Sequence, residues 1–267
     1  STRDVTVTVA YASTAYFEVW STFGDSASAL LTCTTTSGGS GRLTIPRQAP
    51  GTYFIVAQTA ASTGPLAASV STMVPGTMSG YSLGLAPTDV NYTDVCTAPG
   101  AARVLPSVDD SSVMAALPFA FRFWGSNLAA GAGVGISSNG FINLTGAASS
   151  LTGGSIPDAS DGVHGVIAAN WIDLVTGPSG VCYATLGVAP TRRWVVQWPG
   201  ARRYSSATSP INMEIVLNES TNTIDLVYGS SMTSGGTIGV ENQTGTQAVT
   251  YPSTMPLANV RLRFTPN

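Results

Sequence analysis

The chain has 267 residues, of which only 9% are charged, and its 11 basic and 14 acidic groups leave a net charge of −3. This length allows one or two domains, and so weak a charge excludes the basic surface of a nucleic-acid-binding protein. All 11 basic residues are arginine, which excludes lysine-based catalysis and lysine isopeptide crosslinks.

The first 75 residues show the alternation of short β-strands. Residues 5–9 read Val-Thr-Val-Thr-Val, the period-2 pattern of a half-buried strand. Further strands are expected at residues 16–20, 29–32, 41–45, 49–57 and 66–72. We therefore expect a compact all-β unit over residues 1–75.

Residues 76–94 are rich in Gly, Pro and Ser and predict a linker. A second series of strand patterns occupies residues 95–267, in which Asn139-Gly140 is a strong hairpin signal. The strands are expected at 117–124, 134–143, 166–174, 181–186, 194–198, 213–217, 224–228, 237–241, 248–251 and 260–264. This spacing is typical of sandwiches. We predict an all-β fold of two tandem antiparallel β-sandwich domains, jelly-roll-like, at 1–75 and 95–267.

Two features bear on the cellular location: the absence of a membrane-spanning pattern and the number of cysteines. No apolar run approaches the ~18 residues of a membrane-spanning helix. The chain opens in strand pattern, as expected of a processed mature protein or of a trimmed fragment. We expect a secreted or cell-surface protein. Its three cysteines, Cys33, Cys96 and Cys182, allow one disulfide, and the sequence leaves all three pairings open.

The second series resembles a module of bacterial secreted and cell-surface proteins. Its blocks stand here at Leu117–Gly125, Ser137–Phe141 (Ser-Ser-Asn-Gly-Phe), Gly165–Asp173, Ala189–Trp198 and Gly239–Gly245 (Gly-Val-Glu-Asn-Gln-Thr-Gly). The resemblance covers residues 95–265. It implies an extracellular β-sandwich without catalytic residues, of the kind found in adhesins, matrix components and accessory modules.

The first unit resembles the pre-peptidase C-terminal (PPC) type of β-sandwich, through Asp25–Leu31 before Cys33 and Ala49–Tyr53. The acidic loop and second cysteine that follow in that family are missing here, which removes its calcium role. The resemblance therefore implies that Cys33 lacks its usual local partner. It implies a Cys96–Cys182 bridge, with Cys33 free or intermolecular.

The sequence offers one set of candidate catalytic residues and two sets of candidate calcium ligands. His164, the only histidine, could act with Asp158, Asp161 or Asp173, but no nucleophile elbow accompanies it, and an exposed loop histidine is the expected alternative. The same aspartates, or the pair Asp109–Asp110, could bind calcium. Turn aspartates usually cap backbone donors instead. We expect no catalytic residue, metal ion or cofactor.

A glycan platform is the binding alternative. Trp194 and Trp198 share one strand face, where they could stack on sugar rings, although the same spacing is expected more often of core side chains. Arg192 and Arg193 flank this strand and could hold an anionic glycan or solubilise a hairpin end.

The favoured function is a non-enzymatic extracellular structural protein, possibly a self-assembling fibre or coat subunit. Low charge removes the lysines that protect strand edges. The strand with Val5, Val7 and Val9 could add to the sheet of a neighbouring copy. The alternative is a glycan-binding adhesin or accessory module. We expect partners to be copies of the chain or glycans, with no nucleic acid and no membrane span.

Overall fold

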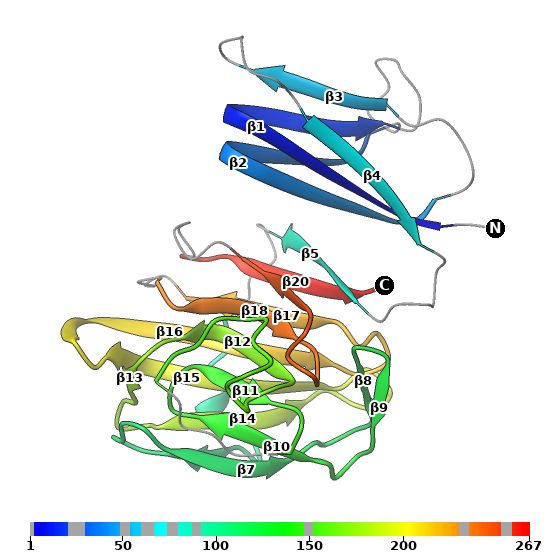
Figure 1. The fold of residues 1–267 in the computed structure, drawn as a ribbon. Helices are drawn as coiled ribbons and strands as arrows, with labels where there is room; N and C mark the ends of the chain where they lie inside the picture. Colours follow the sequence, from blue (N-terminus) through cyan, green and yellow to red (C-terminus); the bar gives the residue numbers. More distant parts are fainter. Residues whose placement is uncertain are drawn as a thin grey trace. The chain divides into compact units, whose positions relative to one another are not determined.

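A computed structural model shows the fold (Figure 1). It describes residues 3–20, 30–48, 54–59, 67–73, 80–86, 92–146, 152–229, 235–251 and 258–267. These residues form antiparallel strands and one short 3-10 helix, so the predicted all-β, antiparallel fold is confirmed. The chain divides into two compact units, residues 1–79 with Asn267, and residues 80–266, which we call the first and second units.

In its described residues, the first unit is a four-stranded antiparallel sheet. Its strands are β1 (Arg3–Trp20), β2 (Leu30–Gln48), β3 (Phe54–Thr59) and β4 (Ala67–Met73). Strand β1 joins two segments that the sequence analysis separates, and β2 does the same. Along one edge β1 pairs with β2, and along the other it pairs with β4 and then β3. Strand β1 is therefore the central strand of this sheet.

The second unit contains a six-stranded sheet in the order β19-β18-β12-β11-β10-β7. Its strands are β7 (Ser112–Ala116), β10 (Gly133–Ser137), β11 (Phe141–Asn143), β12 (Val166–Trp171), β18 (Thr237–Glu241) and β19 (Ala248–Thr250). The hairpin predicted at Asn139-Gly140 joins β10 to β11. Gly140 has φ +80°, and a Cβ there would lie 2.4 Å from the Asn170 carbonyl oxygen. Only glycine fits this turn without strain.

An eight-stranded sheet faces it, in the order β5-β20-β17-β16-β15-β14-β6, with β13 also paired to β15. Its strands are β5 (Tyr81–Ala86), β6 (Ala102–Val104), β13 (Leu174–Val175), β14 (Val181–Leu186), β15 (Arg193–Arg203), β16 (Ser206–Asn218), β17 (Ile224–Tyr228) and β20 (Arg261–Pro266). A small hairpin, β8 (Phe121–Phe123) with β9 (Ser126–Leu128), lies apart from both sheets. Residues 81–86, placed in a linker by the sequence, thus form a strand of this unit.

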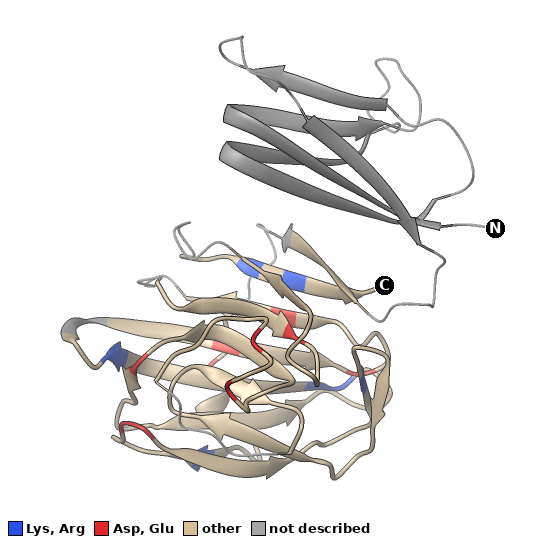
Figure 2. Cartoon of the chain, viewed as in Figure 1, with Lys and Arg blue, Asp and Glu red and all other residues tan. Residues whose placement is uncertain are grey.

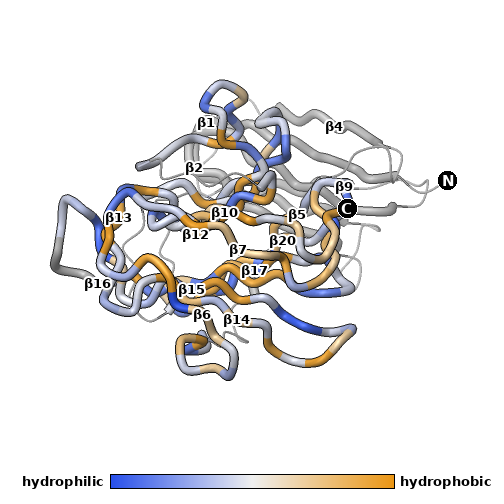
Figure 3. The backbone as a smooth tube through the Cα atoms, turned by 90° about the horizontal axis from the view of Figure 1, so that it is seen from below, coloured by the Kyte–Doolittle hydropathy of each residue, from blue (hydrophilic) through white to orange (hydrophobic). Residues whose placement is uncertain are grey.

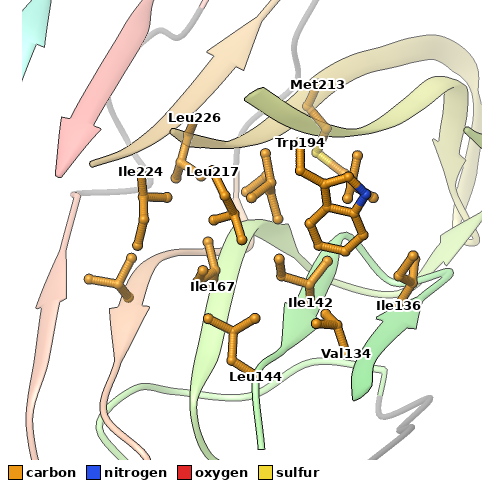
Figure 4. Close-up of a cluster of buried hydrophobic side chains, with 14 of the residues drawn as sticks. Val134, Ile136, Ile142, Leu144, Ile167, Trp194, Met213, Leu217, Ile224 and Leu226 are labelled. Carbon is orange, nitrogen blue, oxygen red and sulfur yellow. The ribbon is translucent and has the colours of Figure 1, made fainter. Parts of the chain in front are cut away.

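The core of the second unit lies between these two sheets. Figure 4 shows Ile142 and Ile167 of the six-stranded sheet opposite Leu217, Leu226 and other side chains of the eight-stranded sheet. The most apolar segments follow the strands, and the hydrophilic ones lie mostly in the connections (Figure 3). Fully burying a side chain of this size contributes about 1.5–3 kcal/mol, so this core accounts for the sandwich.

Charged residues are sparse and scattered along the second unit (Figure 2). Three carboxylates there are nevertheless almost fully buried, those of Glu214, Asp225 and Glu241. Among the described residues, no helix is both long enough and apolar enough to cross a membrane.

Candidate functional site

The disulfide joins Cys96 to Cys182, the pair that the PPC resemblance implies. Cys96 lies in the 3-10 helix η2 (Val95–Thr97), and Cys182 lies in β14. The Arg103 guanidinium also donates to the Cys96 carbonyl oxygen, at 3.0 Å. The bridge therefore fastens the segment before β6 to the outer face of the eight-stranded sheet. Cys33 belongs to β2, and its side chain lies outside the described residues.

A buried polar network fastens the same segment a second time. The Thr93 amide donates to Glu214 Oε1 at 2.9 Å, and the Val95 amide donates to Gln197 Oε1 at 3.1 Å. Gln197 Nε2 in turn donates to the Thr93 carbonyl oxygen at 3.0 Å. Burial raises the pKa of Glu214 to about 8, although the Thr93 hydrogen bond acts against it. This carboxyl therefore holds its proton through most of the neutral range.

Both candidate tryptophans are core residues. Trp194 is 1% exposed and Trp198 0%, and the Trp198 indole nitrogen donates to the Ser137 carbonyl oxygen at 2.9 Å. Alternate residues of β15 point inward to the core between the sheets, and these two lie on that inner face with Val196. The glycan platform predicted on Trp194 and Trp198 is therefore wrong, because neither indole has a face for a sugar.

The two arginines beside this strand differ. The Arg192 guanidinium donates to both Glu219 carboxylate oxygens, at 2.6 and 2.8 Å, and lies 5.4 Å above the Phe119 ring. The Glu219 pKa is lowered, mainly by these hydrogen bonds from Arg192. Arg192 is thus engaged within the fold and does not serve as a free grip for an anionic glycan. Arg193 is exposed.

His164 lies among carboxylates. Its Nδ1 is 3.8 Å from Asp161 Oδ1 and 4.0 Å from Glu241 Oε2, and neither Nδ1 nor Oε2 has a hydrogen-bond partner. Glu241 Oε1 accepts from the Asp158 amide at 2.9 Å, and burial raises the Glu241 pKa. The histidine is 23% exposed, so it is more enclosed than the loop residue expected. Its surroundings connect the loop at 158–164 to β18.

The candidate calcium ligands are grouped in the structure differently from the two sets that the sequence suggests. Carboxylate oxygens of Asp109, Asp110 and Asp173 lie within 4.8 Å of one another, whereas Asp158 and Asp161 belong to the His164 loop. Asp110 accepts from Asn139 Nδ2 at 2.8 Å. Desolvation, and then its two acidic neighbours, raise the pKa of Asp173. The cluster is thus a site of charge repulsion beside the β10–β11 turn.

The strand predicted to join a neighbouring copy has both edges occupied. Val5, Val7 and Val9 pair with Ile45, Leu43 and Gly41 of β2 on one side. On the other side they pair with Thr72, Val70 and Ala68 of β4. The prediction of an assembly strand at residues 5–9 is therefore wrong for the folded unit, since an added strand needs an unpaired edge.

Strand β7 has an unpaired edge that the sequence pattern does not reveal. It ends the six-stranded sheet, and no other described strand pairs with its second edge. Its sequence, Ser-Val-Met-Ala-Ala, carries no charge, proline or glycine, and Met114 is 43% exposed. Edge strands are normally protected by charges, prolines or bulges. The sequence signal was present in these five residues, but only the strand order shows that they form an edge.

The other edges of the second unit differ from β7 in charge, length or composition. Strand β6 contains the exposed Arg103, and β19 has three residues. Strand β5 is uncharged and has six residues, but it includes Gly84. Strand β7 combines five uncharged residues without glycine or proline with the exposed apolar side chain of Met114.

Comparison with protein families finds one matching family model, described as "NIDO related", over residues 81–265. The match begins at β5 and ends within β20, so it spans the sandwich of the second unit. Comparisons with curated proteins and with solved structures find no match.

Proposed function

The chain belongs to the NIDO-related family, whose domain is of the extracellular type, and from this premise we propose a non-catalytic structural module that associates with copies of itself. The observation that carries the proposal is the open, uncharged edge of β7 in the second unit. The Cys96–Cys182 disulfide fits an oxidising, extracellular environment.

The absence of catalysis in this proposal is supported by the surroundings of the polar groups. His164 Nδ1 faces the carboxylates of Asp161 and Glu241, and no hydroxyl or thiol of the described residues forms a hydrogen bond with it. Glu214 is used to fasten the segment at Thr93, and Glu219 to hold Arg192. In the part of the chain that the structure describes, these groups bind other parts of the fold.

Association through β7 places a second copy of this strand antiparallel to the first, around a two-fold axis. Such pairing is self-complementary, as closed homodimers require. Met114, Ser112 and Ala116 lie on one face of β7, and no side chain of the strand opposes its copy with like charge. The six-stranded sheets of two copies then form one continuous sheet, and any further contact builds a fibre or coat from these dimers.

The test measures the molar mass of the full chain by light scattering after size exclusion, from micromolar to millimolar concentration. We expect a concentration-dependent dimer or larger assembly. Met114→Lys places an ammonium group on the exposed face of the edge in each copy, and we expect it to weaken association at least about 10-fold. A wild-type chain that stays monomeric throughout overturns the proposal.

The matched control is Val188→Lys. Val188 is also an exposed apolar residue, at 76%, but it lies in the turn between β14 and β15. This substitution adds the same charge away from β7, so association should be unchanged. Equal weakening by both substitutions would show that net charge, not the β7 edge, governs association.

A further inference from the structure

A cavity of about 420 Å³ lies in the second unit, where β12 ends and β18 begins. Four stretches line it: residues 153–156, 171–172, 235–238 and 250–251. Its volume lies in the range of small-molecule sites. It is separate from β7, and association through that edge makes no use of it.

Glycine backbone forms two walls of this cavity. A Cβ on Gly154 would lie 2.6 Å from the Trp171 ring, and one on Gly236 would lie 2.7 Å from Asn170 Oδ1. Both positions thus need glycine for close packing, and Gly153 and Gly235 beside them also have no side chain. A ligand therefore meets backbone along these walls, where other residues would present side chains. The Gly236 N–H already donates to Asn170 Oδ1 and the Gly154 carbonyl oxygen already accepts from Thr237, so the ligand bonds to the remaining peptide groups and lone pairs.

Among the residues that the structure describes, none that lines the cavity is charged. The Arg203 guanidinium lies against the backbone of Gly235, but Arg203 is not part of the lining. A charged ligand would lose its hydration without gaining an opposite charge among the lining residues. The lining therefore favours a neutral ligand.

The side chains of the lining are partly apolar and partly hydroxyl-bearing. Ile172 is partly exposed and provides apolar surface, whereas Ile156 and Ile238 are buried, and Ser155, Thr237 and Thr250 provide hydroxyls. Thr237 donates its proton to the Gly154 carbonyl oxygen, so its oxygen is left to accept from a ligand.

Tyr251 adds an aromatic ring to this lining and is 8% exposed. A fully apolar ligand would cover the exposed hydroxyls of Ser155 and Thr250 without offering them a hydrogen bond, at a cost. A molecule with both donors and acceptors on an otherwise apolar ring matches all of these groups.

We propose that this cavity binds a short neutral saccharide. The sugar's C–H face lies against Ile172 and the Tyr251 ring, and its hydroxyls bond to the hydroxyl groups of Ser155, Thr237, Thr250 and Tyr251 and to free glycine peptide groups. This site is distinct from the Trp194–Trp198 platform, whose indoles are buried.

The experiment titrates the full chain with uncharged gluco-, galacto-, manno- and N-acetylglucosamine oligosaccharides. Sialylated and sulfated oligosaccharides and inorganic sulfate serve as charged comparisons. Binding is followed by calorimetry and by tryptophan emission, to which Trp171 in the wall should contribute. We expect at least one neutral oligosaccharide to bind and the charged probes not to bind.

Two variants locate the binding. Thr250→Arg places a long cation at an exposed lining position and should weaken binding at least about 10-fold. Tyr251→Phe keeps the ring and removes one hydroxyl, which should weaken binding about 2- to 12-fold, the factor for one neutral hydrogen bond. Val188→Arg, outside the cavity, should leave binding unchanged.

Three outcomes overturn the proposal: no neutral oligosaccharide binds, a charged probe binds more tightly, or Thr250→Arg binds as the wild type does. The molar mass of the same samples tests the proposed function separately. If the chain associates but binds no sugar, only the saccharide site is refuted. If the chain binds a sugar but stays monomeric, only association through β7 is refuted.

Discussion

Glu214 should make the stability of the second unit fall as pH rises. Its carboxyl is 1% exposed, and its pKa is raised from the usual 4.5 to about 8, chiefly by burial. The folded chain therefore holds a proton there that the unfolded chain releases near pH 4.5. Stability from this group is complete below pH 4.5 and is lost as pH rises to about 8. At about 1.4 kcal/mol per pH unit, the whole loss is at most about 5 kcal/mol.

Glu214→Gln keeps the shape of the side chain and cannot ionise. We expect the variant to match the wild type near pH 4.5 and to be more stable at pH 8.5, by about 2–5 kcal/mol. Urea unfolding at pH 4.5, 6.5 and 8.5 without reductant measures this difference. Tryptophan emission is a suitable signal, since Trp124, Trp171, Trp194 and Trp198 belong to the second unit.

The test is the difference in stability between the wild type and Glu214→Gln at each pH. The pH dependence of the wild type alone is not specific to Glu214, because burial also raises the pKa values of Glu241 and Asp173. Glu219→Gln is the control: the Glu219 pKa is lowered by its hydrogen bonds to Arg192, so this variant should lose stability above pH 4.5. A Glu214→Gln variant whose stability parallels the wild type at all three pH values would refute the reasoning.

Three further predictions concern the fold. Replacing Cys96 and Cys182 by alanine opens a bridge that spans 86 residues and should cost about 4–5 kcal/mol in urea unfolding; no change would show that the network at Glu214 fastens the segment alone. Gly140→Ala should destabilise the second unit by more than about 2 kcal/mol, because its Cβ meets a backbone oxygen at a positive φ; a thermal midpoint equal to wild type would contradict this. Deleting residues 1–9 removes part of the central strand of the first unit, so that unit should become protease-sensitive while β7 association persists; lost association with an intact first unit would restore residues 5–9 as the assembly strand.

Local patterns predicted much of the second unit because they depend on neighbouring residues. The alternation through Phe119, Phe121 and Phe123 predicts one common face, and all three side chains are buried. The turn at Asn139-Gly140 follows from backbone preferences of two residues and joins β10 to β11 as expected. The same reasoning favoured core positions for Trp194 and Trp198, which the structure confirms, but it kept a surface platform as an alternative, because alternation shows that residues share a face and not which face is covered.

Strand order could not be predicted in this way. The alternation of residues 5–9 is equally typical of an edge strand and of a central strand. Strands β2 and β4, which pair with these residues, come about 35 and 60 residues later in the chain. Asp173 meets Asp109 and Asp110 across more than 60 residues for the same reason. Strand β7 was missed because a five-residue neutral segment is unremarkable until the sheet order places it at an edge.

The sparse charge of the second unit links the two proposals, because many of its charged groups are bound within the fold. Asp225 holds Arg263 at 2.7 Å, Glu219 holds Arg192 at 2.6 Å, and Glu214 is buried under the segment at Thr93. These charged groups bind other parts of the fold. Strand β7 and the described lining of the cavity carry no charge. A neutral edge does not repel its copy, and a neutral cavity does not favour ions. Met114→Lys adds a charge to the β7 edge and should weaken association but not sugar binding. Thr250→Arg adds a charge to the cavity and should weaken sugar binding but not association.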